Sequence, residues 1–173
     1  MLNNKPTVSY RLMKPGEEPQ VIDLVIDVFS ECVAPHYSQE GIEEFRRFAN
    51  ADALAERLLS GNFVLIAEAG RGIIGIIELR ENTHVAMFFV GKSHQRQGIG
   101  RTLLRKSIAI CTEREPTLKR MTVNSSPNAF PAYRQIGFKA VEDEQIVNGI
   151  RFIPMALIFD QRQTSCPGVD GNQ

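Results

Sequence analysis

Tryptophan, a net charge and long hydrophobic runs are all missing from this sequence. None of its 173 residues is Trp, and 20 Lys and Arg balance 20 Asp and Glu. A balanced charge provides no basic field for a nucleic acid, so we expect no nucleic-acid partner. The longest apolar runs, such as GIIGII and MALIF, are far too short to span a bilayer, so we expect no membrane partner either.

Cysteine is also scarce. Cys32, Cys111 and Cys166 form an odd set without CxxC spacing, which fits neither a disulfide framework nor a zinc site. We therefore expect no metal, and we expect Cys111 to be buried within a helix. Three unpaired thiols, and an N-terminus without the apolar core of a signal peptide, favour a cytoplasmic location.

Hydrophobic periodicity predicts strands and helices in one domain over residues 6–159, followed by a disordered polar tail over 160–173. The predicted strands are 8–13, 63–69, 72–80, 84–90, 118–124 and the two segments that flank Asn148-Gly149. The predicted helices are 19–33, 38–48, 52–59, 98–112 and 129–135. This order indicates an α/β fold, a mixed sheet of about seven strands with helices on both faces.

The connections predict how the strands pair. Short turns within 63–90 indicate an antiparallel meander, and the helix between 84–90 and 118–124 favours a parallel pair. Asn148-Gly149 is a strong signal for a tight hairpin. Pro154 has no N–H to donate, so we expect it at a sheet edge or a bulge.

The segment QRQGIG, residues 95–100, stands between a predicted strand and a predicted helix. The first amides of a helix lack internal partners, and glycine lets an anion approach the backbone, which together favour a pyrophosphate. A P-loop would need Lys where Arg101 stands, and the dinucleotide fingerprint would need Gly where Leu103 stands. The sequence therefore fits neither of these two loops. The third phosphate-binding loop to consider is the one that binds coenzyme A.

Gln95-x-x-Gly98-x-Gly100 resembles the Q/R-x-x-G-x-G/A signature of the GNAT superfamily of N-acetyltransferases. A second block, Thr122 to Phe138, resembles the second motif of that family through Asn124, Ala129, Tyr133 and Gly137-Phe138. The order of elements also matches, so the resemblance covers roughly residues 6–159.

The chain departs from the family pattern in two places. GKSH stands where the family often has a proline, and Ser126 stands where it often has a second asparagine. Pro131 falls inside a predicted helix, which is acceptable if Asn128 caps that helix and places the proline in the first turn.

The resemblance implies acetyl-CoA as the co-substrate. It assigns to the backbone N–H of Val90 the role of hydrogen-bond donor to the developing oxyanion. It assigns to Tyr133 the role of general acid, which protonates the leaving thiolate. The residues that it assigns to the coenzyme are Phe88, Phe89, Val90, Gln95, Arg96, Gln97, Gly98, Ile99, Gly100, Arg101, Asn124, Ser126 and Tyr133.

No motif fixes the base that removes the proton of the amine. Glu78 shares a strand face with Ile74 and Ile76, which favours a partly buried carboxylate with a raised pKa. The equal alternative is a carboxylate at the strand end that is paired with Arg80 or solvated. His84 is the second candidate, with a structural role as its alternative.

In the family, the region after the first long helix walls the acceptor cleft. Glu31, His36 and Tyr37 fall there, and Glu31 is either an attractor of a cationic amine or a solvated charge at a helix end.

The leading hypothesis is an N-acetyltransferase in which a primary amine attacks acetyl-CoA directly. The acceptor is either a small molecule or a protein amine. The alternative is a non-catalytic acyl-CoA sensor, which the presence of Tyr133 and Asn124 disfavours. By analogy with the family, the two C-terminal strands could pair in a homodimer.

Overall fold

The structure is a computed structural model that describes residues 7–159. The predicted tail, 160–173, lies outside the described residues. The strands are β1 (Val8–Leu12), β2 (Phe63–Ala69), β3 (Gly72–Arg80), β4 (His84–Val90), β5 (Arg120–Ser125), β6 (Lys139–Ala140), β7 (Gln145–Val147) and β8 (Ile150–Ile158). The helices are α1 (Glu18–Cys32), α2 (Gln39–Phe48), α3 (Ala51–Leu59), α4 (Ile99–Arg114) and α5 (Phe130–Ile136), with short 3₁₀ helices η1 (Ala34–His36) and η2 (Lys92–His94).

The strands form one mixed sheet in the order β1-β2-β3-β4-β5-β8-β6, with β7 also paired to β8. The antiparallel meander from β2 to β4 and the parallel pair of β4 and β5 are confirmed. The predicted α/β fold is confirmed as well, with eight strands where about seven were expected.

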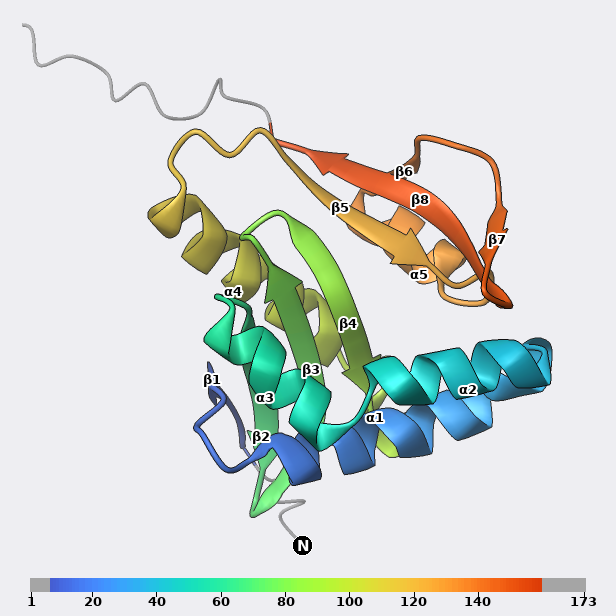
Figure 1. Cartoon of the computed structure of the whole chain (residues 1–173). Helices are drawn as coiled ribbons and strands as arrows, with labels where there is room; N and C mark the ends of the chain where they lie inside the picture. Colours follow the sequence, from blue (N-terminus) through green and yellow to red (C-terminus); the bar gives the residue numbers. More distant parts are fainter. Residues whose placement is uncertain (1–6, 160–173) are drawn as a thin grey trace, which may run out of the picture.

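Helices cover both faces of the sheet (Figure 1). Helices α1, α2 and α3 lie on one face, where side chains of α1 and α3 pack with Val64, Ile66 and Ile76. Helices α4 and α5 lie on the other face, where Leu103 and Leu104 join the larger core. Cys111 is fully buried there as predicted, and burial raises the pKa of its thiol to about 11.

Strands β4 and β5 are paired at only one end. Their register contains two pairs, His84 with Thr122 and Val85 with Val123. Directly after them, the register of β4 against β3 shifts, which leaves Ala86 as the extra residue of a bulge. Beyond this point the two strands diverge, so the sheet opens like a V between β4 and β5 (Figure 1).

The C-terminal hairpin confirms the predicted turn and corrects one detail of the strands. Asn148 and Gly149 both have positive φ and form the expected tight turn between β7 and β8. The preceding segment is not one strand, because residues 141–144 separate β6 from β7. Pro154 is not at an edge, because β8 pairs with β5 on one side and with β6 and β7 on the other. It does face an irregularity of the bulge type, since residues 141–144 oppose only residues 153 and 154 of β8, which agrees with the expected bulge. It lies opposite the gap between β6 and β7, where its carbonyl accepts from Val141 N–H.

The predicted cap of α5 is also wrong. Asn128 is not the residue that precedes the helix, since Ala129 is, and no side chain caps it. Pro131 still falls in the first turn, where its missing N–H is not needed. The Asn128 side chain instead donates to the Cys32 carbonyl at the end of α1, at 2.7 Å. A long-range contact has therefore replaced a local one.

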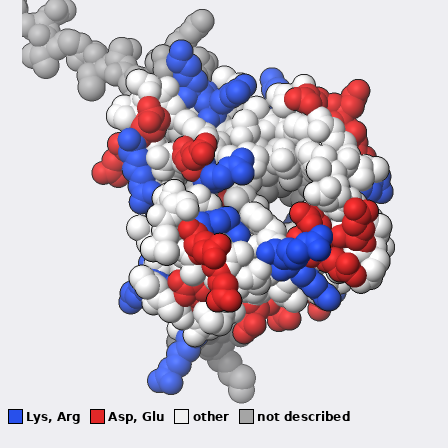
Figure 2. Space-filling model, viewed as in Figure 1, with Lys and Arg blue, Asp and Glu red and all other residues white. Residues whose placement is uncertain are grey.

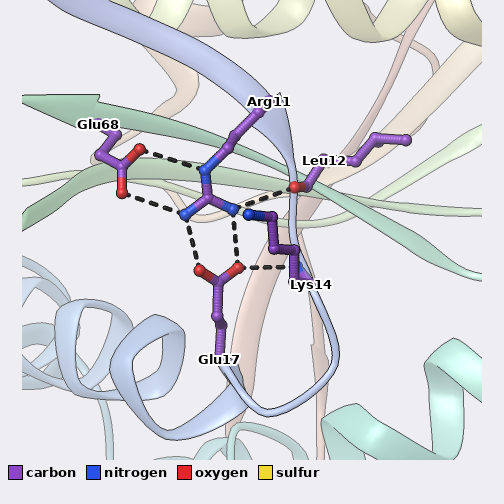
Figure 3. Close-up of polar contacts among 5 residues, drawn as sticks. All are labelled: Arg11, Leu12, Lys14, Glu17 and Glu68. Atoms are coloured by element: carbon purple, nitrogen blue, oxygen red, sulfur yellow. Dashed lines mark hydrogen bonds and ion pairs between the residues drawn. The ribbon is translucent and has the colours of Figure 1, made fainter.

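An ion-pair network ties β1 to its neighbours (Figure 3). The Arg11 guanidinium donates to Glu68 of β2 and, at 2.7 and 2.8 Å, to both carboxylate oxygens of Glu17, the residue that precedes α1. These hydrogen bonds, with one from the Lys14 N–H, lower the pKa of Glu17 to about 2. The network fixes where α1 leaves β1 and hence where the helix lies on the sheet.

Candidate active site

A cleft of about 650 Å³ occupies the opening between β4 and β5. Its floor comes from residues 84–90 of β4 and from Val123 and Asn124 of β5. Helices α1 and α2 wall it on one side of the sheet, and α5 walls it on the other. Because the strands diverge here, the cleft passes between the two faces of the sheet. An elongated ligand bound in the opening would therefore contact helices from both faces of the sheet.

Tyr133 lies on the α5 side of this cleft. It is 7% exposed, and its ring contacts Phe88 at 5.9 Å and Phe138 at 5.4 Å between centroids. Among the described residues, no hydrogen bond involves its hydroxyl group. Burial raises the pKa of this hydroxyl above its ordinary value, so the group stays protonated at neutral pH. Tyr133 therefore presents a protonated hydroxyl group, which can donate its proton, at the wall of the cleft.

The backbone of Val90 is turned toward the opening. Gly91 N–H donates to Ile74 O, so Val90 and Gly75 form a non-hydrogen-bonded pair of the antiparallel ladder. In such a pair, the N–H and C=O of each residue point away from the partner strand. The Val90 N–H therefore faces the cleft, where the family resemblance places the oxyanion donor.

The predicted phosphate loop forms a ring of free donors at the start of α4. Arg96 and Gly98 both have positive φ, +62° and +82°, which turns successive amides toward one point. Among the described residues, the six amides from Arg96 to Arg101 donate to no backbone or side-chain acceptor. Such a nest at a helix N-terminus is a strong anion site.

Glutamine side chains hold this loop in shape. Gln95 Nε2 donates to Val90 O at 2.9 Å, and Gln97 Nε2 donates to Ser93 O at 3.0 Å. A Cβ at Gly100 would lie 3.3 Å from the Phe88 ring, so a larger residue would crowd the approach from the loop to the cleft. The loop and the cleft are therefore continuous through Gln95, Phe88 and Gly100.

The other residues predicted to bind the coenzyme divide into two groups. Phe88, Phe89, Asn124 and Ser126 line the cleft beside Tyr133. Ile99 is 3% exposed, so only its backbone can serve a ligand. The Arg96 and Arg101 side chains are exposed at the loop. The structure thus brings the predicted coenzyme residues together as one loop and one adjoining cleft.

Glu78 is buried but does not line the cleft. It is fully inaccessible to solvent and accepts from Arg57 Nε at 2.8 Å, Arg57 Nη2 at 3.0 Å and Asn62 Nδ2 at 2.7 Å. Two charge-assisted hydrogen bonds from Arg57 and one hydrogen bond from the Asn62 amide satisfy the carboxylate, on the α3 side of the sheet. Of the two alternatives, burial is the one that the structure shows, and the carboxylate is neither solvated nor paired with Arg80. This geometry argues for a structural role.

His84 does line the cleft. Its Nδ1 lies 2.8 Å from the hydroxyl of Thr122 on the neighbouring strand, which leaves Nε2 as the other ring nitrogen. Burial, together with the nearby Arg80 charge, lowers the pKa of His84 to about 4. The imidazole is therefore neutral at pH 7.

Of the three residues predicted on the acceptor side, only Tyr37 lines the cleft. Its hydroxyl donates to the Arg151 carbonyl at 3.0 Å. Glu31 forms an exposed ion pair with Lys92 at 2.9 Å and lies outside the lining, whereas His36 borders a smaller cavity beside Pro127.

Sequence reasoning missed most of the acceptor wall. The missed lining residues are Phe29, Glu44, Phe45, Phe48, Arg80 and Phe152. Phe45 and Phe48 stand three residues apart, a spacing that places them on one helix face. That spacing was the available signal, but it does not distinguish a cleft wall from an ordinary core. Among the described residues, no cluster of His, Cys, Asp and Glu could hold a metal ion. No helix within residues 7–159 has the length and apolarity that crossing a membrane requires.

Comparison with family models identifies the class. Residues 33–159 match the model of the acetyltransferase (GNAT) domain. The chain therefore belongs to the GNAT family, and it is an N-acetyltransferase by family. No curated protein matches the chain.

Solved structures share the fold. A GCN5-related N-acetyltransferase from Rhodopseudomonas palustris has a TM-score of 0.75 at 22% identity, with 92% of this chain and 99% of that chain covered. The PaiA N-acetyltransferase from Thermoplasma acidophilum, solved with coenzyme A, has a TM-score of 0.72 at 21% identity, covering 88% and 99%. An aminoglycoside 6′-N-acetyltransferase complexed with coenzyme A has a TM-score of 0.60 at 13% identity, covering 88% and 96%.

Proposed function

We propose that this protein transfers the acetyl group of acetyl-CoA to a primary amine, which attacks the thioester directly. The observation that carries the proposal is the continuity of the free amides at Arg96–Arg101 with the cleft that contains Tyr133. An anion site that opens into a channel with a proton donor suits a ligand with a pyrophosphate at one end and a thioester at the other.

The residues present fit the coenzyme. The amides of Arg96–Arg101 would hold the pyrophosphate, and the absence of a side chain at Gly98 and Gly100 keeps the approach to them open. The edge of β4 from Phe88 to Val90, which no strand within residues 7–159 covers and where the Val90 carbonyl accepts from Gln95, would hold the pantetheine arm, with Asn124 and Ser126 across the opening. When bound, acetyl-CoA supplies an activated acyl carbonyl and a thiolate leaving group.

Two groups of the chain act on the reacting atoms in this proposal. The Val90 N–H donates to the carbonyl oxygen as negative charge develops there. The Tyr133 hydroxyl gives its proton to the departing sulfur, so the C–S bond breaks as a thiol is formed. The new C–N bond takes its electron pair from the amine. Tyr133 then recovers its proton from water.

His84 accepts the surplus proton of the amine nitrogen in this proposal, through Nε2, and passes it to water. An imidazole whose pKa is about 4 is a weak base, so it cannot deprotonate a free alkylammonium ion efficiently. The amine therefore enters in its neutral form, and His84 serves only after the attack has made the nitrogen acidic. Glu78 is not assigned a role, because its carboxylate is already satisfied away from the cleft.

Titration calorimetry with acetyl-CoA tests the coenzyme site. We expect micromolar binding that Gly98→Asp abolishes, because the aspartate places a negative charge in the amide nest. Gly61→Asp is the matched control, since Gly61 also has positive φ and open space around its Cβ position but lies in the turn after α3. Absence of binding by the folded wild-type protein would overturn the proposal.

The sensor hypothesis predicts the same binding without turnover. The cleft disfavours the sensor hypothesis, because a protein that only binds the coenzyme does not need the proton donor Tyr133 or a Val90 N–H that faces the thioester. A cytoplasmic location, a single domain over 6–159 and a homodimer through the C-terminal strands stay predictions.

A further inference from the structure

The acceptor part of the cleft has almost no charge. Among the described residues that line the whole cleft, Glu44 is the one carboxylate and Arg80 is the one guanidinium, and His84 is neutral at pH 7. Figure 2 shows a hollow near the middle of this face whose wall is largely uncharged, with side chains of both signs around it and several acidic ones grouped at the right. The cleft therefore lacks the several carboxylates that an acceptor with many ammonium groups would need.

Glu44 is itself partly occupied. One of its carboxylate oxygens accepts from both Nε and Nη2 of Arg47, one turn further along α2. The pair neutralises much of the charge that Glu44 would otherwise present. A single, already paired carboxylate can accommodate at most one ammonium group, so it does not favour a polyamine or an aminoglycoside over a monoamine.

Aromatic rings make up the wall where charge is absent. Phe29 and Phe45 stack with centroids 3.9 Å apart, and Phe45 contacts Phe89 at 6.0 Å. Phe48, at the end of α2, and Phe152, on β8, extend the same lining. Aromatic walls favour burial of an alkyl or aryl body, which gains free energy in proportion to the apolar area removed from water.

A closed end limits the shape of the acceptor. The tip of the β7–β8 hairpin meets α2 at Gly149 and Gly41, where a Cβ at position 149 would lie 2.6 Å from Gly41 N and from Ser38 Oγ. Tyr37 also donates to the Arg151 carbonyl, and Asn128 donates to the Cys32 carbonyl. Figure 1 shows the tip of the β7–β8 hairpin beside the end of α2, on the far side of the opening between β4 and β5. The contacts therefore bridge the mouth of this opening. An extended polypeptide could not lie across the opening while they hold.

From the uncharged aromatic lining and the bridged mouth, we propose that the acceptor is a small monoamine with an apolar alkyl or aryl body. This inference rests on the proposed function and narrows it. It excludes polycations and protein lysines as preferred acceptors, although one structural neighbour is named as an aminoglycoside acetyltransferase. The difference lies in the side chains of the cleft, since a shared fold leaves those free to vary.

The test compares hexylamine with 1,6-diaminohexane, which differ at the far end by one ammonium group. Release of the coenzyme thiol from acetyl-CoA is followed with the full chain. We expect kcat/KM for hexylamine to exceed that for the diamine by at least about tenfold, because the second ammonium would be buried without a partner. Phenylethylamine should react like hexylamine, and spermidine, kanamycin and a lysine-containing peptide should react no better than the diamine.

A cleft variant checks that the lining sets this preference. Phe152→Asp places a carboxylate in the cleft and should move the ratio of the two amines toward the diamine by about tenfold, whereas Phe152→Leu should keep it. Equal or better turnover of the diamine, spermidine, kanamycin or the peptide by the wild-type protein would overturn this inference and leave the proposed function standing. Absence of thiol release with every amine, despite acetyl-CoA binding, would overturn both.

Discussion

Gly149, at the tip of the β7–β8 hairpin, lies so close to Gly41 of α2 that neither position has room for a Cβ. The two residues are 108 positions apart in the chain, and they join the strand side of the cleft to its helix side. The contact decides how wide the mouth of the cleft can be. Its geometry leads directly to a prediction about acceptor binding.

We expect Gly41→Ala to loosen this contact. The new Cβ would collide with the Gly149 carbonyl oxygen, so α2 or the hairpin must move, at about 1–3 kcal/mol in the free energy of unfolding. The KM for the amine should rise severalfold while the Kd for acetyl-CoA stays the same, because the phosphate loop is not touched. Gly72→Ala is the control, since its Cβ would meet nothing closer than 4.0 Å. An amine KM and a stability equal to those of Gly72→Ala would contradict the prediction.

Tyr133→Phe should separate chemistry from binding. Loss of the general acid should lower kcat by about 10²–10⁴-fold. The melting temperature and the Kd for acetyl-CoA should change little, because the described residues offer the hydroxyl no hydrogen bond that the substitution would break. Steady-state kinetics, calorimetry and thermal unfolding measure the three quantities. A kcat within a few-fold of the wild type would remove Tyr133 from the mechanism and favour a solvent proton donor.

The fold was largely predictable because its signals are local. Periodicity located every long helix and strand to within a few residues, and Asn148-Gly149 marked the last hairpin correctly. The phosphate loop was predictable for the same reason, since Gly98 and Gly100 act on their own stretch of backbone. The error at Asn128 has a clear physical cause. Its side chain donates to the Cys32 carbonyl, which is distant in sequence, and not to the amides of the helix that follows it.

The acceptor wall was not predictable, because it is assembled from segments far apart in sequence. Alternation along β3 left burial of Glu78 and a solvated or Arg80-paired carboxylate as equal alternatives, and nothing in the local pattern identified Arg57 and Asn62 as its partners. Phe45 and Phe152 have the same hydrophobic character as core residues. Only the divergence of β4 from β5 makes them lining residues, and that divergence begins beside the bulge at Ala86, which the hydrophobic pattern does not mark.

The pH dependence of kcat/KM should follow the amine and not the protein. His84, with its pKa near 4, is neutral throughout the range from pH 6 to pH 9, so it adds no inflection there. The fraction of neutral amine rises about tenfold per pH unit below the pKa of the amine, and kcat/KM should rise with it. The inflection should move to lower pH when benzylamine, a weaker base, replaces hexylamine. An inflection near pH 6.5 that is the same for both amines and is lost in His84→Gln would contradict this.

His84 should also affect how the free energy of unfolding depends on pH. Its pKa is lower in the folded protein than its ordinary value of 6.5, so the unfolded chain binds the proton more readily. The free energy of unfolding is therefore unaffected above pH 6.5 and falls as the pH drops from 6.5 toward 4. His84→Gln should flatten this part of the curve of stability against pH, measured by urea unfolding. A variant curve that parallels the wild type would show that His84 is not the group responsible.

Glu78→Gln should damage stability and spare catalysis. The substitution removes the charge from a buried carboxylate that faces Arg57 and Asn62, which leaves the guanidinium poorly compensated, and we expect a loss of about 2–4 kcal/mol. Activity per folded molecule should stay within about twofold of the wild type, because Glu78 does not line the cleft. Urea unfolding gives the first quantity, and kinetics at a temperature well below the transition gives the second.

Glu68→Gln provides the matched control for this substitution. Glu68 also pairs with an arginine, Arg11, but its side chain is 25% exposed, so its loss should reduce stability by no more than about 1 kcal/mol. If Glu78 were the base, Glu78→Gln would instead lower kcat by about 10²-fold or more in fully folded protein. That result would require β3 to move when substrates bind, because the carboxylate is held away from the cleft by three hydrogen bonds. A large loss of stability with normal turnover would confirm that Glu78 holds α3 to the sheet.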